Sequence, residues 1–378
     1  MPEAHDPLHC GAMPALPIFV DTQADLNRVC EIVSHCNTVA LDTEFVRTRT
    51  YAPHLGLLQI AAADMIVCVD PLANLDYSTL WQLLFDPVRA NILHSASQDL
   101  EVMWFQQGGI INNLIDTQIC AAFLNYPPQI GYAGLVDDLF GVTISKEQTR
   151  TDWTRRPLTD EQIDYAAKDV VHLHEMHKIL RERLEAKNRY NWALEDSAAL
   201  CNLSLYMPNT ENAWQRIKSI PFLPAKQQPR AMRLAQWREE RAVKLDKPRK
   251  WVIDDKIILE LAAANPANEQ ALANLHGIPE GLARRQGSYL LNVLAKGNDD
   301  YAKNPAAYIQ EIPNRERDTA INKKLMQIVK RKAAELEIPA EILASRRDIT
   351  ATMRGITDAR VLSGWRFEII GQELQAAL

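Results

Sequence analysis

The sequence predicts an α/β domain with a mixed sheet, followed by an all-α region made of two related helical modules. Three observations lead to this prediction. Short apolar runs alternate with amphipathic segments over residues 17–208, a pattern typical of strands layered with helices. From residue 209 the strand pattern vanishes, and Pro and Gly separate helical segments instead. Within this second region, one set of residues recurs at a constant offset.

The first region can be assigned element by element. A strand, a helix and a strand cover PIFVDTQADLNRVCEIVSHCNTVALDTEF, and GLLQIAA and MIVCVD continue the sheet as a meander. YSTLWQLLFDP is predicted as a helix that stops at Pro87, ANILHSA as a strand, and SQDLEVMWFQQGG as a helix that ends at a Gly pair. NLIDTQICAAFLNYPP is predicted as a strand and a helix, and LVDDLFG as a short helix. A long amphipathic helix is predicted over residues 159–190, with Thr159 or Asp160 as its N-cap.

The helical region contains an internal repeat at an offset of 91 residues. Five residues of the first copy recur in the second. Those of the first copy are Leu234, Gln236, Ala242, Leu245 and Pro248, and those of the second are Leu325, Gln327, Ala333, Leu336 and Pro339. In each copy a helix is followed by a turn that starts at Pro and by another helix. The repeat therefore predicts two related helical modules, with residues 295–318 as the linker between them.

Composition narrows the class of protein. The 378 residues are 47% hydrophobic and 24% charged, as in a globular protein, and no apolar run is long enough to span a membrane. The N-terminus lacks a signal-peptide pattern. The six cysteines have no CxxC or zinc spacing and are typical of reduced thiols. We therefore expect a cytoplasmic protein without a membrane partner, and a monomer in the absence of any oligomer signal.

The net charge of −6 conceals an asymmetry between the two regions. Residues 1–208 contain 14 basic and 27 acidic side chains, whereas residues 209–378 contain 28 basic and 21 acidic ones. An acidic region that holds cations and a basic region that holds phosphates would produce this split. Charged helix surfaces that serve only solubility explain this split equally well.

Two carboxylates lie two residues apart in the apolar run VALDTEF. Because alternate residues of a strand point to the same face, Asp42 and Glu44 are predicted to lie side by side. Like charges at this spacing repel and raise each other's pKa, a cost that a bound cation would offset. A solvated face on an edge strand is the alternative that this motif alone leaves open.

Two further segments supply acidic residues. Asp99 is predicted in the first turn of the helix that follows ANILHSA, where it could also serve as a simple cap. Tyr165 and Asp169 are four residues apart and therefore share one face of a helix. Together with Asp42 and Glu44, these side chains form a set that could bind two divalent cations about 3.5–4 Å apart. Oxygen ligands of this kind suit Mg²⁺ or Mn²⁺.

The motifs that carry these residues resemble a known family. VALDTEFVRTRTYAPHLGLLQIA, LHSASQDLEVM and IDYAAKDVVHLHEMH are similar to the three exonuclease motifs of the DEDD superfamily of 3′→5′ exonucleases, in its tyrosine-bearing subgroup. DTQICAAFL and TDWTRRPLT resemble the ribonuclease D family at matching points, and the likeness covers almost the whole chain. LANLHGIPEGLARRQGSYLLNVL is similar to the end of an HRDC domain, and LSGWRFEIIGQEL matches that pattern less closely.

The resemblance implies a fold and a set of domains. It implies a ribonuclease H-like exonuclease domain at residues 17–208, after an N-terminal extension at 1–16. Two HRDC-like domains would follow at 209–296 and 297–378.

The resemblance also implies an activity. Asp42, Glu44, Asp99 and Asp169 would bind two divalent metal ions, Mg²⁺ or Mn²⁺, and Tyr165 would orient the attacking water. The expected reaction is the release of 5′-mononucleotides from RNA 3′ ends, notably from tRNA precursors. Tyr165 suits orientation better than proton abstraction, because an ordinary tyrosine pKa near 10 makes a poor base at neutral pH.

Several neighbouring residues are candidates for contact with the substrate. Phe45 could stack on or wedge the terminal bases, whereas Leu58 is expected in the core. Gln59 could reach the substrate backbone or be an ordinary polar strand residue. Arg155 and Arg156, beside Trp153, could hold phosphate or form a solvated turn. In the helical region, basic residues alternate with Trp237 and Trp251 in a way that suits RNA, although both tryptophans are expected in the core.

Three functions are compatible with these motifs. The first is the exoribonuclease, and the second is a DNA exonuclease with the same metal chemistry, because no residue of the acidic set distinguishes a 2′-hydroxyl. The third is a nucleic-acid-binding protein with an inert nuclease domain. The presence of all five site residues weighs against the third.

Overall fold

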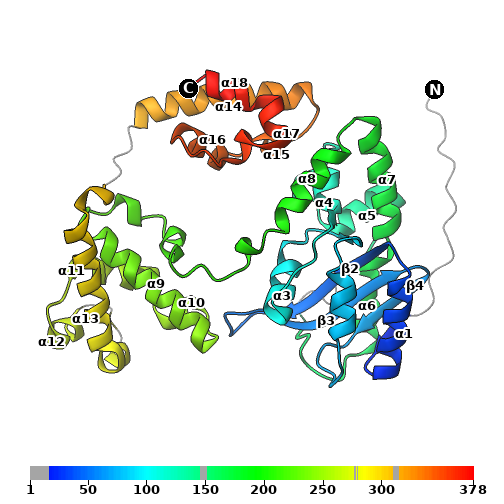
Figure 1. Cartoon of the computed structure of the whole chain (residues 1–378), viewed down its shortest axis with the longest axis horizontal. Helices are drawn as coiled ribbons and strands as arrows, with labels where there is room; N and C mark the ends of the chain where they lie inside the picture. The colour runs from blue at the N-terminus through cyan, green and yellow to red at the C-terminus, as the bar shows by residue number, and fades with distance from the viewer. Residues whose placement is uncertain (1–16, 145–150, 276–277, 279, 310–314) are drawn as a thin grey trace. The chain divides into compact units, whose positions relative to one another are not determined.

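The computed structural model describes residues 17–144, 151–275, 278, 280–309 and 315–378, so the expected N-terminal extension, residues 1–16, lies outside it. The described chain forms two compact units (Figure 1). Unit 1 contains the residues up to Val46, His54–Tyr206 and Thr319–Leu378, and unit 2 contains Arg47–Pro53 and Met207–Asp318. Each unit therefore combines stretches that are separate in the sequence.

Unit 1 is built on a mixed six-stranded sheet with the order β1-β4-β3-β2-β5-β6. The strands are β1 (Ile18–Val20), β2 (Thr38–Val46), β3 (His54–Ala62), β4 (Met65–Val69), β5 (Ala90–Leu93) and β6 (Leu114–Asp116). Strands β2, β3 and β4 form the predicted antiparallel meander, whereas β1, β5 and β6 join it in parallel. The predicted α/β fold with a mixed sheet is confirmed.

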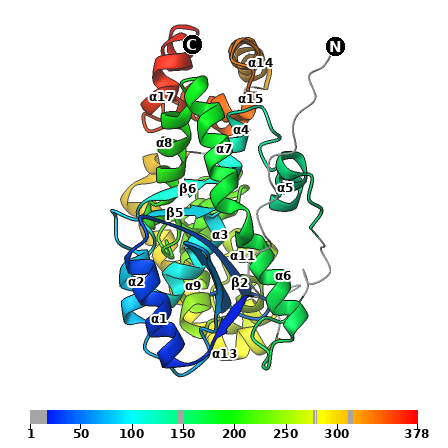
Figure 2. The same cartoon turned by 90° about the vertical axis from the view of Figure 1, so that its right-hand side faces the viewer.

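Helices cover both faces of this sheet. They are α1 (Gln23–Ser34), α2 (Ser78–Leu84), α3 (Ser97–Gln107), α4 (Thr117–Ala122), α5 (Tyr132–Phe140), α6 (Asp160–Val171), α7 (Leu173–Ala186) and α8 (Tyr190–Leu200). Val39 and Leu41 of β2 share a core with α1, α2 and α3, whereas Ala40 faces α4, α5, α7 and α8. Figure 2 shows α1 and α2 on the opposite side of the sheet from α6. Strand β2 is therefore buried on both sides.

The predicted long helix over residues 159–190 is two helices. Thr159 caps α6 and forms a capping box with Gln162, as its sequence position predicted. The helix ends at His172, whose N–H donates to the Tyr132 hydroxyl at 3.2 Å and whose ring stacks on Phe140 at a centroid distance of 5.1 Å. These contacts come from α5, so periodicity within the segment could not reveal the break.

The internal repeat corresponds to a structural repeat. The first copy lies in unit 2, with α9 (Gln228–Leu245), α10 (Arg249–Val252), α11 (Asp255–Ala264), α12 (Glu269–Ala273) and α13 (Glu280–Lys303). The second copy lies in unit 1 from Thr319 onward, with α14 (Arg315–Glu335), α15 (Ala340–Leu343), α16 (Arg346–Met353), α17 (Gly364–Arg366) and α18 (Gln372–Ala376). Each Pro of the repeat is the N-cap of a four-residue helix, α10 or α15.

Backbone geometry repeats at the same offset. Asp246 and Glu337, which are 91 residues apart, both have left-handed backbones with φ of 46° and 50°. Asp254 and Ser345 cap α11 and α16 with their side chains. Most residues with a side chain disfavour the left-handed backbone conformation. Because it occurs at the same position in both copies, the two copies share one local fold.

The second copy packs on α8 within unit 1. Trp365 stacks on Trp192 with ring centroids 4.7 Å apart and planes 11° apart. The Arg366 guanidinium donates to both carboxylate oxygens of Asp196, at 2.5 and 2.6 Å. Apolar residues of α14 also share the core of α7 and α8. Stacking, a buried ion pair and a common core therefore join the second copy to the exonuclease part.

The segment between β2 and β3 belongs to unit 2. The Tyr51 hydroxyl donates to Glu239 at 2.6 Å, and the Arg249 guanidinium lies 4.6 Å from the centre of the Tyr51 ring. The backbone N–H groups of Tyr51 and Ala52 donate to Asp246 Oδ1 at 3.0 and 2.9 Å. Tyr51 is buried by these contacts. Segment 47–53 is thus a structural part of the first helical copy.

The predicted linker is wrong over residues 295–303, which continue α13. Gly297 lies against α9, where an added Cβ would come within 2.7 Å of Arg230 Cα. Asn298 accepts from Arg230 Nε at 2.7 Å, and Asp300 forms an ion pair with Arg233 at 2.6 Å. Residues typical of loops therefore serve close packing between two helices. No helix of the described residues is long and apolar enough to cross a membrane.

We expect Gly297→Ala to destabilise unit 2, although Gly→Ala usually stabilises a helix. The new Cβ would push α9 and α13 apart, at a cost of about 1–3 kcal/mol. The matched control is Gly287→Ala in the same helix, where the nearest heavy atom to the new Cβ is 3.4 Å away. Urea unfolding should show a loss for the first variant and none for the control. Equal effects of the two changes would contradict this packing.

Candidate metal centre

Three acidic side chains of unit 1 converge at the end of β2. Carboxylate oxygens of Asp42, Glu44 and Asp169 lie within 4.8 Å of one another. Asp42 and Glu44 come from β2 and point to the same face of the strand, while Asp169 comes from α6. The strand pairing is regular through Glu44 and shifts only between Glu44 and Phe45. Regular pairing thus keeps the two strand carboxylates in line.

Asp99 lies in the first turn of α3 and is 6% exposed. Its Oδ1 accepts a hydrogen bond from the Thr43 hydroxyl at 2.5 Å. The start of α3 is held by Asp116, which accepts from the backbone N–H groups of Ser95 and Ala96 at 3.1 and 2.9 Å. Asp116 also caps α4 through its side chain. It therefore fixes the backbone that presents Asp99 and caps the following helix.

The acidic groups have raised pKa values. Burial, followed by the charges of Asp99, Asp169 and Glu44, raises the pKa of Asp42 well above its usual range. Burial and the charges of Asp169 and Asp99 raise the pKa of Glu44 to about 8. Burial raises the pKa of Asp99 and of Asp169 to about 7. Acidic groups are therefore concentrated here, and no cationic side chain of the described residues is among the causes that shift their pKa values.

The donor set fits a divalent cation of the Mg²⁺ or Mn²⁺ type. Carboxylate oxygens are the ligands that these hard ions prefer, and no cysteine or histidine belongs to the described cluster. Gln59 of β3 pairs directly across from Asp42, is fully buried, and has no hydrogen-bond partner for either amide atom. Buried amide groups are normally paired. The donor and the acceptor of the Gln59 amide therefore both remain unpaired in a strand that pairs with β2 at Asp42.

Tyr165 lies one turn before Asp169 on α6. Its ring stacks on Trp153, with centroids 6.3 Å apart and planes 26° apart. Trp153 is buried against β3 at Gly56, where an added Cβ would lie 2.6 Å from the Trp153 carbonyl oxygen. The bare backbone at Gly56 therefore allows the loop at Trp153 to approach the strand and support the Tyr165 ring.

The candidate substrate residues have different environments. The Arg156 guanidinium donates to both oxygens of Asp70, at 2.8 and 2.5 Å, and to the Gly56 carbonyl at 2.7 Å. These contacts engage Arg156 in anchoring its own loop, whereas Arg155 is exposed. Phe45 is half-buried beside the apolar core. Leu58 is 1% exposed, which confirms its predicted place in that core.

Sequence reasoning missed Thr43, Asp70 and Tyr132. Thr43 lies between the two carboxylates of the motif. That position was the sequence feature that could have indicated its hydrogen bond to the third acidic residue, Asp99. Asp70 directly follows the β4 segment, and its ion pair with Arg156 can be recognised only in the folded structure. Tyr132 accepts from the His172 N–H and donates to the Lys168 carbonyl at 2.9 Å. It thereby braces the helix that carries Asp169.

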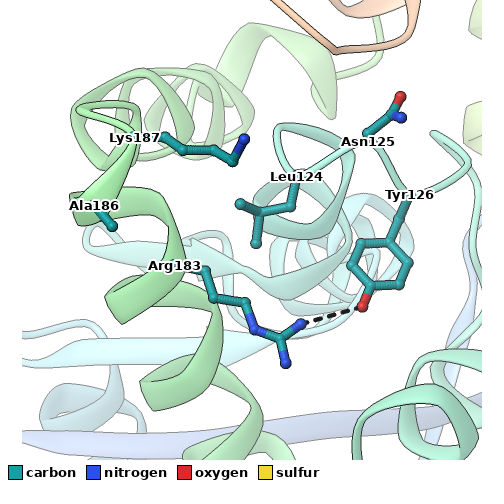
Figure 3. A pocket seen from close by; sticks show the side chains of 6 residues that line it. All are labelled: Leu124, Asn125, Tyr126, Arg183, Ala186 and Lys187. Carbon is teal, nitrogen blue, oxygen red and sulfur yellow. Dashed lines mark hydrogen bonds between the residues drawn. The ribbon is translucent and has the colours of Figure 1, made fainter. Parts of the chain in front are cut away.

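A pocket elsewhere on unit 1 has a volume of about 490 Å³. Figure 3 shows its lining, which is Leu124, Asn125, Tyr126, Arg183, Ala186 and Lys187. Its charged groups are engaged: Arg183 donates to the Tyr126 hydroxyl at 3.4 Å, and Lys187 lies 3.2 Å from Glu337. None of the acidic site residues lines this pocket.

Comparison with known proteins identifies the family. Residues 17–185 match the family model for the 3′-5′ exonuclease domain, and residues 227–294 match that for the HRDC domain. Ribonuclease D of Escherichia coli (strain K12) is 33% identical over 95% of this chain and 98% of its own length. The chain belongs to the ribonuclease D family. It is therefore an exoribonuclease, as its motifs implied.

Other relatives agree with this membership. Ribonuclease D of Granulibacter bethesdensis is 33% identical over 95% of this chain and 92% of its own length. The crystal structure of Escherichia coli RNase D superposes with a TM-score of 0.87 and 31% identity, covering 96% of this chain and 98% of that one. The ribonuclease H-like domain and the C-terminal HRDC fold of the family are therefore present here. The HRDC model matches the first helical copy, and the second copy is related to it by the internal repeat.

We expect Asp42→Asn to stabilise the metal-free chain. A raised carboxyl pKa in the folded state imposes a penalty that is absent below the unfolded value near 4 and grows as the pH rises above it. The gain should therefore be larger at pH 8 than at pH 5, with a rise in Tm of about 3 °C or more at pH 8. Thermal scans in EDTA at both pH values measure it. A lower Tm for the variant at pH 8 would contradict this account.

We expect Arg156 and Asp70 to act as one structural pair. Their side chains are 25% and 8% exposed, so Arg156→Gln and Asp70→Asn should each cost about 2–4 kcal/mol of unfolding free energy. The double variant should lose little more than either single one, because each change breaks the same contact. Urea unfolding of the three variants tests this. Additive losses would mean that each residue acts through other contacts.

Proposed function

We propose that the chain removes 5′-mononucleotides one at a time from the free 3′ ends of RNA, and that it trims the 3′ trailers of tRNA precursors. The convergence of Asp42, Glu44 and Asp169 next to Asp99 and Tyr165 is the observation that supports this proposal. The solved Escherichia coli relative is described as an exoribonuclease involved in structured RNA processing. This description agrees with a folded RNA that has a single-stranded end.

The proposed reaction assigns a role to each site residue. Asp42, Glu44, Asp99 and Asp169 would hold two divalent ions, which would supply an activated water and charge stabilisation for the leaving 3′-oxygen. Tyr165 would orient that water by a hydrogen bond from a ring that Trp153 holds in place. Thr43 would keep Asp99 turned toward the site through its 2.5 Å hydrogen bond.

We assign Phe45, Gln59, Arg155 and Arg156 to the surroundings of the reacting phosphate. Half-buried Phe45 would contact the terminal base, and exposed Arg155 would meet the RNA backbone. Buried Gln59 would donate and accept hydrogen bonds beside Asp42. Arg156, through its pairing with Asp70, would act on the substrate by positioning Arg155.

The first test is a denaturing-gel time course on a 3′-tailed tRNA transcript and on a DNA oligomer of the tail sequence, each with Mg²⁺, Mn²⁺ or EDTA. We expect the RNA to shorten one nucleotide at a time from its 3′ end, and EDTA to abolish the reaction. Trimming of DNA alone would assign the site to DNA. Intact substrates under every condition would reduce the protein to nucleic-acid binding.

We expect Asp42→Asn to abolish cleavage while leaving RNA affinity within about twofold. The change removes one metal ligand, whereas most of the affinity comes from basic side chains in the helical half. Gel cleavage with Mg²⁺ and fluorescence anisotropy with labelled RNA measure the two effects. Turnover at the wild-type rate would refute the assignment of Asp42.

We also propose that the protein acts as a monomer in the cytoplasm. The described cysteines Cys30, Cys36, Cys68, Cys120 and Cys201 are all free thiols, as in reducing compartments. Sedimentation of the full chain with and without RNA tests the monomer, and a dimer in the absence of RNA would contradict it.

A further inference from the structure

The Tyr132 hydroxyl lies within the hydrogen-bond ladder of the segment that carries Tyr165 and Asp169. In an uninterrupted α-helix, the His172 N–H would donate to the carbonyl four residues earlier, which is that of Lys168. Here the hydroxyl accepts from the His172 N–H at 3.2 Å and donates to the Lys168 carbonyl at 2.9 Å. One side-chain oxygen thus bridges two backbone groups at the point where α6 ends.

A side chain inserted into the ladder interrupts or bends a helix. Asp169 therefore lies in the last turn of α6, whereas the predicted helix over residues 159–190 would have placed it in the interior. A carboxylate in the last turn is unfavourable, because the free carbonyl groups there carry partial negative charge. The break thus adds to the negative potential around Asp169, which favours a bound cation.

The Tyr132 ring is anchored from the side of the sheet. His94, which directly follows β5, meets the ring edge-on, with centroids 5.8 Å apart and planes 69° apart. The His94 ring forms hydrogen bonds with the Thr117 hydroxyl and the Ile130 carbonyl, each at 2.9 Å. A fixed imidazole therefore supports the ring whose hydroxyl reaches α6.

A second residue of α5 contacts the same break. The Phe140 ring stacks on the His172 ring with centroids 5.1 Å apart. Tyr132 and Phe140 are the first and last residues of α5 and, at a spacing of eight, lie on the same face of the helix. A shift of the end of α6 would therefore have to displace contacts at both ends of α5.

The Tyr132 hydroxyl acts on the backbone of α6, although acidic side chains are close to it. Burial raises the pKa of Tyr132 above its usual range, and the charges of Asp169 and Asp42 raise it further. The hydroxyl therefore keeps its proton at neutral pH, and it uses that proton on the Lys168 carbonyl. Both of its hydrogen bonds join backbone groups that flank Asp169 in the sequence.

We propose that Tyr132 is a positioning residue for Asp169, because it sets the direction in which the last turn of α6 presents that carboxylate to Asp42 and Glu44. The hydroxyl keeps the His172 N–H apart from the Lys168 carbonyl. Without it, the two backbone groups pair directly and straighten the helix, or they lose their partner. Either change moves Asp169. The proposal rests on the proposed function, because it takes Asp169 as a metal ligand.

The test measures Mn²⁺ binding to the full-length chain by titration calorimetry without RNA. Tyr132→Phe removes only the hydroxyl and should raise the Kd about tenfold, the lower end of the loss seen when a group that orients a metal ligand is changed. Tyr126→Phe is the matched control, because its hydroxyl links Asp138 of α5 to Arg183 of α7 and should leave the Kd unchanged. An unchanged Kd in Tyr132→Phe, or equal losses in both variants, would overturn the proposal.

Steady-state kinetics separate positioning from a purely structural role. Tyr132→Phe should lower kcat and raise the Mg²⁺ concentration needed for half the maximal rate, while the KM for RNA stays within about twofold of wild type. Thermal unfolding in EDTA measures the stability of the same variant. A lower Tm with wild-type kcat and wild-type Mn²⁺ affinity would mean that Tyr132 only stabilises the fold, and the proposal would be overturned.

The wild-type measurements distinguish the two ways in which the idea could fail. If the wild-type chain binds no Mn²⁺ and leaves RNA intact, the proposed function fails, and this proposal fails with it. If the wild-type chain binds Mn²⁺ and cleaves RNA, and Tyr132→Phe equals it in both, only the positioning role of Tyr132 is overturned.

Discussion

The repulsion among the acidic groups at the end of β2 is the constraint on which the rest of unit 1 depends. Asp42, Glu44 and Asp169 bring carboxylate oxygens within 4.8 Å, and Asp99 adds a further charge. Left alone, such groups would separate or become protonated. They stay together because a central strand, two helices and their caps fix the backbone from which each one extends. The fold therefore holds these acidic groups together at a cost in stability, which a bound divalent cation would offset.

The acidic residues are held in place by neighbouring side chains that are either uncharged or paired with another group. Thr43 holds Asp99, Asp116 holds the start of α3, and Tyr132 braces the helix of Asp169. The loop at Trp153 is fastened to β3 and β4 through Arg156 and Asp70, and in turn backs the Tyr165 ring. In the proposed reaction the acidic residues would contribute the chemistry, and these neighbours would maintain their geometry.

Local rules predicted much of this arrangement. The period of two placed Asp42 beside Glu44, the capping pattern located the start of α6, and the repeat anticipated two helical copies. Failures came where a tertiary contact overrides the local pattern. The break at His172 depends on Tyr132, and Gly297 serves helix packing in place of a loop. The pairing of Arg156 with Asp70, 86 residues away, likewise could not be predicted from the local sequence.

The basic half shows why composition is a weak guide to binding. Arg230, Arg233, Arg238 and Arg249 are among the residues that make this region basic, yet each is bound to an acceptor of its own unit. Their charge contributes to folding. By contrast, Lys244, Lys247 and Lys250 form no ion pair within the described part of the chain, and Trp251 is exposed, in contrast to its expected place in the core. These differences become visible only once the helices are packed.

Segment 47–53 has a consequence for how this protein could evolve. The hairpin loop that leaves β2 contributes Tyr51 to the interior of the first helical copy, where Glu239, Arg249 and Asp246 bind it. Recombination that transplants the helical copy to another nuclease would leave a buried carboxylate and an arginine without their aromatic partner. The residues of the first helical copy's unit are therefore encoded in two separate stretches, 47–53 and 207–318, and no single cut in the gene separates the two units.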